Sequence, residues 1–191
     1  MKGVHLFLAD GFEDVEALGT CDVLRRGGVN VRLVSLSRGL AVRSSHGVIV
    51  CADERFEDLS PDDGSASAAD VMIFPGGMPG SRNLAACRPL IERMQTHYDA
   101  GGTLAAICAA PGLVLSQLRD VKGLHFTCFS GFEAPLQAKG AVFVEAPAVT
   151  SGRIVTGRSA GHALAFGLQI LARMGSPRVD EVDYALHLNT I

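Results

Sequence analysis

The sequence predicts an α/β domain with a mostly parallel β-sheet, helices on both faces and a small side hairpin. Three observations support this fold class. Short apolar runs recur along the chain, as in strands that are covered on both faces. Helical patterns separate several of these runs, which is typical of βαβ units. Glycine-rich or small-residue turns follow several runs, as they do at the carboxyl edge of an open α/β sheet.

The bulk composition predicts one globular domain spanning residues 1–191. Hydrophobic residues make up 48% of the chain and charged residues 19%, which excludes a disordered protein. The net charge is −3 and no basic run exceeds Arg25-Arg26, which argues against nucleic-acid binding. No apolar stretch is long enough to span a membrane, and the first apolar run is too short for a signal peptide.

The cysteines and histidines predict no metal centre. The five cysteines are odd in number and widely spaced without a C-x-x-C motif, and no metal-ligand spacing occurs among them or the six histidines. In a chain without a signal peptide such cysteines are expected to be reduced, which predicts a cytoplasmic protein. We expect neither a metal nor another cofactor.

The first third of the chain predicts a βαβ unit followed by the side hairpin. Residues 3–9 form the first strand, residues 13–26 a helix that ends at Gly27-Gly28, and residues 29–36 the second strand. Residues 40–44 and 47–51 then flank Ser45-His46 as a hairpin, in which His46 is interpreted as a turn residue and not as a catalyst. Residues 56–69 are acidic and loop-like.

The first turn of the predicted helix carries three carboxylates, at Glu13, Asp14 and Glu16. Interaction with the helix dipole is the simpler explanation for each of them. Glu16 shares a helical face with Thr20 and Val23, so it can instead point into the protein.

A glycine-rich turn, from Pro75 to Gly80, follows the buried strand predicted over residues 70–74. The free N–H groups of Gly76 and Gly77 can form a pocket for an anion or an oxyanion. The alternative is a glycine turn without a ligand. The pattern G-x-G-x-x-G is absent, so the turn predicts no dinucleotide site.

Cys108 lies at an abrupt junction between a strand over residues 103–107 and a helix that begins near Pro111. The apolar face of this helix is expected to consist of Leu113, Val114, Leu115 and Leu118. A side chain at such a junction faces the helix N-terminus, where the dipole favours a thiolate. Small residues surround Cys108 as they surround the nucleophile of hydrolase elbows. The alternative is a buried structural cysteine.

The remaining chain alternates short strands and helices. Residues 84–100 predict a helix broken near Pro89, and a helical turn is expected near residues 131–133. Short strands are expected over residues 126–129, 142–144, 148–150 and 154–156, and a final amphipathic helix through residues 163–174. Arg158 follows a strand end, where it faces either the same crevice as Cys108 or the solvent. Residues 181–188 fit a short helix or a strand.

Four segments occur in one order and carry a family resemblance: Asp10 to Glu16, Pro75-Gly76-Gly77, Ala105 to Pro111, and Thr156-Gly157-Arg158. Together they resemble the ThiJ/PfpI superfamily, most closely its branch of Parkinson-associated protein deglycase (DJ-one) relatives. The resemblance covers essentially the whole chain. It implies a flavodoxin-like three-layer sandwich that forms a homodimer.

The resemblance also implies the roles of individual residues. Cys108 would be the elbow nucleophile and an easily oxidised thiol, and Glu16 a partly buried acid that hydrogen-bonds to its sulfur. Gly76, Gly77 and the N–H of Ala109 would line an anion pocket, and Arg158 would help to bind the anion. The implied substrates are small reactive carbonyls or glycated adducts.

The implied activities are a glutathione-independent glyoxalase or a protein deglycase active in oxidative or carbonyl stress. A redox sensor or chaperone that works through Cys108 oxidation without turnover is the rival hypothesis. A small-molecule amidase or peptidase is disfavoured, because Ala109 stands where the protease-like branch has histidine. Some relatives carry a pocket histidine where this chain has Cys128-Phe129, and His125 need not replace it. Cys51 and Cys128 are either secondary thiols or packing residues, and packing is the favoured interpretation.

Overall fold

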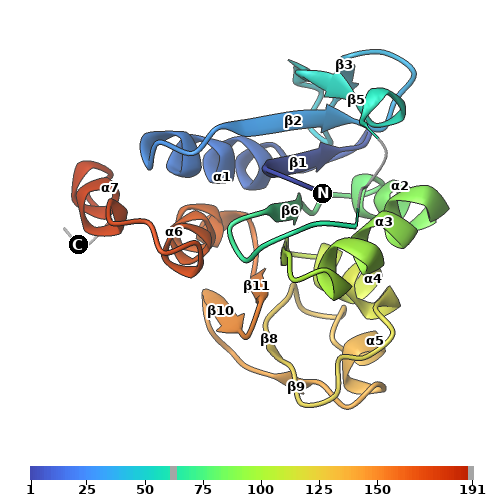
Figure 1. Cartoon of the computed structure of the whole chain (residues 1–191), viewed down its shortest axis with the longest axis vertical. Helices are drawn as coiled ribbons and strands as arrows, with labels where there is room; N and C mark the ends of the chain where they lie inside the picture. Colours follow the sequence, from blue (N-terminus) through green and yellow to red (C-terminus); the bar gives the residue numbers. More distant parts are fainter. Residues whose placement is uncertain (61–63, 189–191) are drawn as a thin grey trace.

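A seven-stranded sheet forms the centre of the computed structural model, which describes residues 1–60 and 64–188 (Figure 1). The strand order is β10-β11-β7-β6-β1-β2-β5, and every neighbouring pair is parallel except β10 and β11. The strands are β1 (Val4–Leu8), β2 (Val31–Ser35), β5 (Glu54–Arg55), β6 (Val71–Phe74), β7 (Thr103–Ile107), β10 (Ala148–Ser151) and β11 (Ile154–Gly157). The predicted mostly parallel sheet is confirmed.

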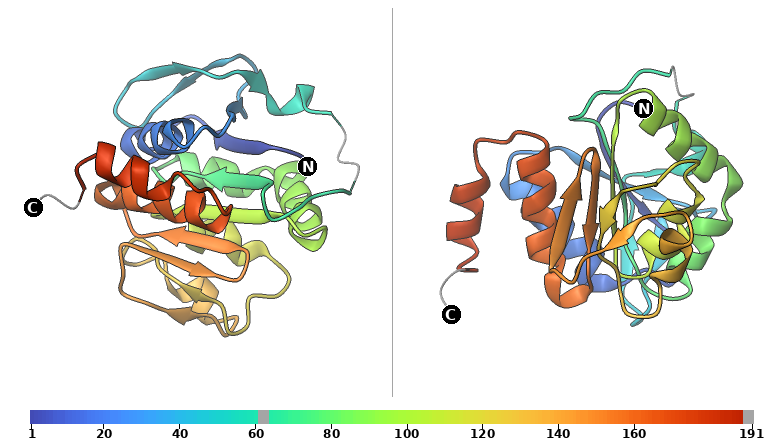
Figure 2. Two further views of the ribbon diagram at one scale, coloured as in Figure 1. Left: turned by 60° about the vertical axis from the view of Figure 1, so that its left-hand side comes forward. Right: turned by 90° about the horizontal axis from the view of Figure 1, so that it is seen from below.

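Helices cover both faces of the sheet, which makes the three-layer sandwich (Figure 2). One face packs on α1 (Asp14–Arg26) and α6 (Ala163–Arg173), with α7 (Val179–Ala185) against α6. The other face packs on α2 (Gly80–Ala86), α3 (Arg88–Asp99) and α4 (Ala110–Leu113). Alternate residues of each central strand enter the two apolar clusters, as the two-residue period of a strand requires.

The register of the central strands brings the two predicted turns together. Val71 to Phe74 of β6 pair with Thr103 to Ala106 of β7. Because both strands end at the same edge of the sheet, Gly76 and Gly77 emerge beside Cys108.

Close packing of α1 against α6 fixes the helix that carries Glu16. A Cβ atom on Gly167 of α6 would lie 2.8 Å from Cβ of Val23 on α1, so a larger residue would push the helices apart. The N-terminal turn of α1 is thereby held over the carboxyl edge of the sheet.

The side hairpin is also confirmed. It pairs β3 (Ala41–Arg43) with β4 (Ile49–Cys51) in antiparallel register. The hydroxyl of Ser44 donates to Asp14 Oδ1 at 2.5 Å, and Nδ1 of His46 lies 2.7 Å from Asp14 Oδ2. His46 lies in the turn, as predicted, and ties the hairpin to the start of α1.

The helix predicted after Cys108 is much shorter than expected. Only α4 is α-helical, and a 3-10 turn, η2 (Leu115–Gln117), replaces its continuation. Pro111 and Gly112 are both poor helix formers, so little favours extension once the first turn has formed. Val114, Leu115 and Leu118 are nevertheless buried, as the apolar pattern predicted.

Other boundaries differ from the predictions. The helical segment begins at α2 and breaks at Cys87 instead of Pro89, because a proline fits the first turn of α3. Helix α5 (Ala134–Gln137) lies slightly later than the predicted turn, and the C-terminal segment forms the helix α7. The strand β8 (His125–Phe126) pairs with β9 (Val142–Phe143) outside the main sheet.

The remaining short elements lie in segments predicted as connections. A 3-10 turn, η1 (Phe56–Asp58), occupies part of the loop predicted over residues 56–69, of which residues 61–63 lie outside the described residues. Another, η3 (Ala160–His162), leads into α6. Among the described residues, no helix combines the length and apolarity that crossing a membrane requires.

Candidate active site

Cys108 forms a strained elbow at the end of β7. Its φ angle is 64°, in the left-handed region that non-glycine residues rarely adopt. The Cys108 N–H donates to the carbonyl of Gly157 at 3.0 Å, and the Cys108 carbonyl accepts from the N–H of Phe129 at 2.8 Å. Bonds on both sides of the residue hold this conformation and fix the direction of the thiol.

Glu16 points into the protein from the first turn of α1 and is 1% exposed. Its Oε2 accepts the N–H of Gly76 at 2.7 Å, and the Cys108 thiol also hydrogen-bonds to the carboxyl group. Its Oε1 is buried without a nitrogen or oxygen partner in the part of the chain that the structure describes. The inward orientation allowed by the sequence is therefore the one observed.

Glu13 holds the start of α1 in register with the glycine turn. Its carboxylate caps the helix by accepting the N–H of Glu16 at 2.7 Å, and its own N–H donates to the carbonyl of Gly76 at 2.9 Å. The capping role favoured by the sequence is correct for Glu13. The cap also places the carboxyl group of Glu16 against Gly76.

Gly76 is required by the closeness of Cys108. A Cβ atom at position 76 would lie 2.6 Å from Cβ of Cys108 and 3.0 Å from its Sγ. Any side chain would displace the thiol, so glycine is the residue that lets β6 and β7 present both turns at one point.

The electrostatics of the pair differ from the sequence prediction. Burial raises the pKa of Glu16 to about 7, and the negative charge of Glu13 adds to this rise. Burial, followed by the charge of Glu16, raises the pKa of the Cys108 thiol to about 12. While Glu16 is ionised, burial and the charge of Glu16 therefore outweigh the effect of the helix N-terminus, and Cys108 keeps its proton.

The physical reason is the size of the opposing effects. The N–H groups of Ala109 and Gly77 hydrogen-bond to the sulfur and lower its pKa, as predicted. Helix α4 has only four residues, so its dipole is small, and burial beside a carboxylate outweighs it. A thiolate becomes favourable when Glu16 carries the proton, because the carboxyl group then donates to the sulfur.

The predicted anion pocket divides into two parts. The N–H of Gly76 is occupied by Glu16, whereas the N–H groups of Gly77 and Ala109 are directed at the sulfur of Cys108. Two donors beside the nucleophile are the arrangement that stabilises an oxyanion formed on an attached carbon.

Arg158 follows β11 at the carboxyl edge of the sheet, as Cys108 follows β7, but its side chain contacts the segment after β8. Its guanidinium donates to the carbonyl of Cys128 and the hydroxyl of Ser130, each at 3.4 Å, and pairs with Glu145 at 3.5 Å. It also lies 5.4 Å from the centroid of the Phe143 ring. These contacts place Arg158 on the segment that follows β8 and not directly on the sulfur.

The groups that influence the thiol are Glu16, Ala109 and Gly77, none of which is a histidine. His125 is exposed, and its backbone N–H donates to Ser151 Oγ at 3.3 Å. Cys128 is buried in an apolar cluster, which supports its interpretation as a packing residue. The same interpretation is wrong for Cys51, because this residue is exposed on the two-stranded hairpin, outside both apolar clusters.

Sequence reasoning missed the part that Phe129 and Thr156 play at the elbow. The Thr156 hydroxyl accepts the N–H of Thr127 at 2.9 Å, which holds the segment whose next residues include Phe129. The pairing is between residues far apart in the sequence, so no local pattern signals it.

One group of possible metal ligands is present among the described residues. Ligand atoms of Glu13, Asp14 and His46 lie within 4.8 Å of one another. The helix cap and the Asp14–His46 ion pair already account for this grouping.

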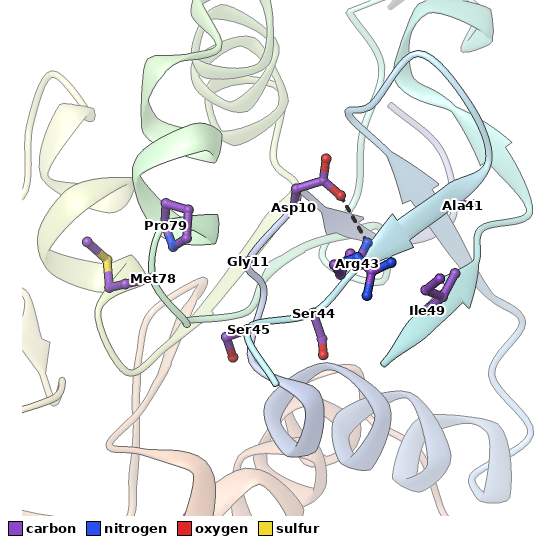
Figure 3. Close-up of a pocket in the computed structure, with 9 residues that line it drawn as sticks. All are labelled: Asp10, Gly11, Ala41, Arg43, Ser44, Ser45, Ile49, Met78 and Pro79. Atoms are coloured by element: carbon purple, nitrogen blue, oxygen red, sulfur yellow. Dashed lines mark hydrogen bonds between the residues drawn. The ribbon is translucent and has the colours of Figure 1, made fainter. Parts of the chain in front are cut away.

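A crevice of about 590 Å³ adjoins the glycine turn (Figure 3). Met78 and Pro79 bound it on one side and the hairpin residues on the other, with Asp10 held by the N–H of Arg43 at 2.9 Å. Its lining is Asp10, Gly11, Ala41, Arg43, Ser44, Ser45, Ile49, Met78 and Pro79. Cys108 is not part of this lining, so this crevice does not contain the thiol.

A doubly covered parallel sheet with a strained cysteine elbow and a buried acid beside it defines an α/β protein of the nucleophile-elbow class. The model of the DJ-1/PfpI family matches residues 2–173. The chain therefore belongs to the DJ-1/PfpI family, and the predicted resemblance is confirmed.

Individual relatives agree with this assignment. Protein DJ-1 homolog A of Arabidopsis thaliana is 35% identical over 189 residues, which cover 98% of this chain and 47% of that protein. The chain thus spans about half the length of that relative. Glutathione-independent glyoxalase DJR-1.2 of Caenorhabditis elegans is 30% identical over 165 residues, covering 86% and 84% of the two chains. A mutant of a DJ-1 superfamily protein from Salmonella typhimurium superposes with a TM-score of 0.84, at 31% identity and 98% coverage of both chains.

Proposed function

We propose that the protein is a cysteine-dependent enzyme that converts small 2-oxoaldehydes, or removes their adducts from proteins, without glutathione. Cys108 is the nucleophile and Glu16 the proton shuttle, within a cytoplasmic response to oxidative or carbonyl stress. The observation that carries the proposal is the buried Glu16 carboxyl group against the elbow thiol, with two backbone donors on the same sulfur. The similarity to the glutathione-independent glyoxalase DJR-1.2 of Caenorhabditis elegans supports the same chemistry.

The first step transfers one proton and forms one bond. Glu16, with a pKa raised to about 7, is partly ionised near neutral pH and accepts the proton of the Cys108 thiol. The sulfur adds to the aldehyde carbon, and the carbonyl electron pair moves onto oxygen. The N–H groups of Ala109 and Gly77 stabilise this oxyanion, and Glu16 then returns the proton to the oxyanion to give a hemithioacetal.

The second half moves a hydrogen between neighbouring carbons. Glu16 removes the proton from the former aldehyde carbon, and the electron pair moves onto the ketone oxygen to give an enediolate. Glu16 then returns this proton to the adjacent carbon, while the proton of the hemithioacetal hydroxyl passes to the neighbouring oxygen. The product is a thioester of a 2-hydroxy acid, which water cleaves to release the acid and the thiol. For methylglyoxal the sum is addition of one water to give lactic acid, so no oxidant or cofactor is consumed.

The test measures loss of purified methylglyoxal and appearance of lactate without glutathione. Wild type, Cys108→Ser and Glu16→Gln are compared at equal concentration, because the serine variant reports scavenging by the other thiols. We expect multiple turnovers by wild type and loss of about 100-fold or more in both variants. Comparable turnover by Cys108→Ser would exclude the proposed nucleophile.

Redox sensing is the second candidate function. The observation that favours it is that a protonated Glu16 can donate to oxygen atoms added to the neighbouring sulfur, because its pKa is raised to about 7. Mild peroxide should then oxidise Cys108 in preference to the four other cysteines, as peptide mass mapping would record. Uniform oxidation of all accessible cysteines would contradict this role.

We also propose that the chain forms a homodimer. Exposed apolar residues lie at Val15 and Leu18 on α1 and at Val48 and Ile49 on the side hairpin, whose turn residue Ser44 donates a hydrogen bond to Asp14 of α1. Apolar side chains on two neighbouring segments suit a self-complementary contact. Ile49→Asp should shift the mass in solution toward the monomer, and an unchanged mass distribution would assign the contact to another surface.

A further inference from the structure

We propose that Phe129 and Phe132 form an aromatic wall beside the Cys108 thiol that selects carbonyl compounds with an aromatic substituent. The preferred substrates would be aryl-substituted 2-oxoaldehydes over methylglyoxal. This inference rests on the proposed function and makes its substrate class more specific.

The wall is connected to the elbow at both ends. The N–H of Phe129 donates to the carbonyl of Cys108 at 2.8 Å, while 47% of Phe129 remains exposed. Phe132 lies against α4, because a Cβ atom on Gly112 would come within 3.0 Å of Cβ of Phe132. The two ring centroids are 6.5 Å apart at an interplanar angle of 59°. The aromatic pair therefore contacts both parts of the elbow, with Phe129 hydrogen-bonded to Cys108 and Phe132 packed against α4.

The backbone of this segment is held in place. The Thr127 N–H donates to Thr156 Oγ1 at 2.9 Å, and its hydroxyl donates to the carbonyl of Ala146 at 3.1 Å. Arg158 donates to Cys128 and Ser130, the residues on either side of Phe129. Phe129 is thus exposed on a segment whose backbone is held by hydrogen bonds. An aromatic ring of a substrate would therefore bind there with little reorganisation of the protein.

Single exposed apolar residues are common and by themselves indicate nothing. The position of Phe129 differs because its backbone binds the nucleophilic residue directly. Met78, which follows Gly77, is also partly exposed and adds apolar surface next to the second backbone donor. Apolar walls around a few polar donors are the usual composition of small-molecule sites. The N–H groups would orient the carbonyl, and the aromatic wall would contact the substituent.

The experiment compares phenylglyoxal with methylglyoxal as substrates of wild type, Phe129→Ala and Tyr184→Ala. Tyr184 lies on α7 and is 81% exposed, so its replacement is a matched removal of a surface aromatic ring. We expect the ratio of kcat/KM values, phenylglyoxal over methylglyoxal, to fall about tenfold in Phe129→Ala and to stay unchanged in Tyr184→Ala. An unchanged ratio in Phe129→Ala would overturn the inference.

A second measurement separates this inference from the proposed function. The rate of Cys108 alkylation by iodoacetamide and by N-benzyl iodoacetamide is followed by peptide mass mapping, which needs no turnover. If wild type turns over neither aldehyde, the enzymatic proposal fails, yet the benzyl preference and its loss in Phe129→Ala would still support the wall. A shift in oligomeric state of Phe129→Ala with unchanged rate ratios would assign Phe129 to a subunit contact and overturn the inference.

Discussion

A buried carboxyl group lies at each end of strand β6, and the surroundings shift the pKa values of the two groups in opposite directions. Asp70 precedes the strand and is 8% exposed, whereas Glu16 lies against Gly76 after the strand and is 1% exposed. Asp70 accepts from the N–H groups of Gly3 and Ser67 and from the Ser67 hydroxyl, each at 2.7 Å. Although burial opposes it, this hydrogen bonding lowers the pKa of Asp70.

Glu16 receives far less compensation for its burial. One backbone N–H and the Cys108 thiol approach it, and its pKa is raised instead. A satisfied buried carboxylate stabilises the fold, while an under-satisfied one holds a proton near neutral pH and can transfer it. The amino edge of β6 is therefore built for stability and the carboxyl edge for chemistry.

The largest expected effect is on methylglyoxal turnover, which should depend strongly on Glu16 and little on Asp70. Glu16→Gln should lower methylglyoxal turnover by about 100-fold or more, because the amide cannot shuttle a proton. Asp70→Asn, at the opposite edge, should leave turnover within about threefold at a temperature where both variants are folded. Steady-state kinetics measures both. Equal losses would show that the two edges are not functionally distinct.

The free energy of unfolding should depend on Asp70 more than on Glu16. Asp70→Asn should lower the free energy of unfolding by about 2–3 kcal/mol, because an amide nitrogen would face donors that now bind a carboxylate oxygen. The depressed pKa means that the wild-type contribution is present above the unfolded pKa of Asp and is lost as the pH falls below it. Urea unfolding at pH 7 and pH 3 tests both statements. A variant as stable as wild type at pH 7 would contradict this account of Asp70.

The smallest effect is a gain in stability on removing the charge of Glu16. A carboxyl group whose pKa rises on folding costs stability as the pH increases from its unfolded pKa to about 7. Glu16→Gln should therefore raise the free energy of unfolding by about 1–2 kcal/mol at pH 8, and by much less at pH 4.5. The comparison uses urea unfolding of both proteins at the two pH values. A pH-independent difference would assign the effect to packing.

At the elbow, local sequence patterns predicted the backbone but not the pKa of the thiol. Apolar runs, Pro111 and small residues around Cys108 predicted the strand, the turn and the buried side chains of the following segment, because these depend on local patterns. The pKa of the thiol was not predictable in the same way. It depends on burial and on Glu16, a residue distant in the chain, and these outweigh a four-residue helix.

The sequence by itself determined the alternation of strands and helices, the glycine turn after β6 and the positions of Cys108 and Glu16 at element ends. Periodicity and turn chemistry are local properties, so they can be read from neighbouring residues. The tertiary structure decided which N–H of the turn binds Glu16, which ones reach the sulfur, and where Arg158 lies. It also placed Phe129 on the carbonyl of Cys108. Those contacts join residues of a helix, strand ends and loops that are distant in the sequence, and only the packed structure determines their register and spacing.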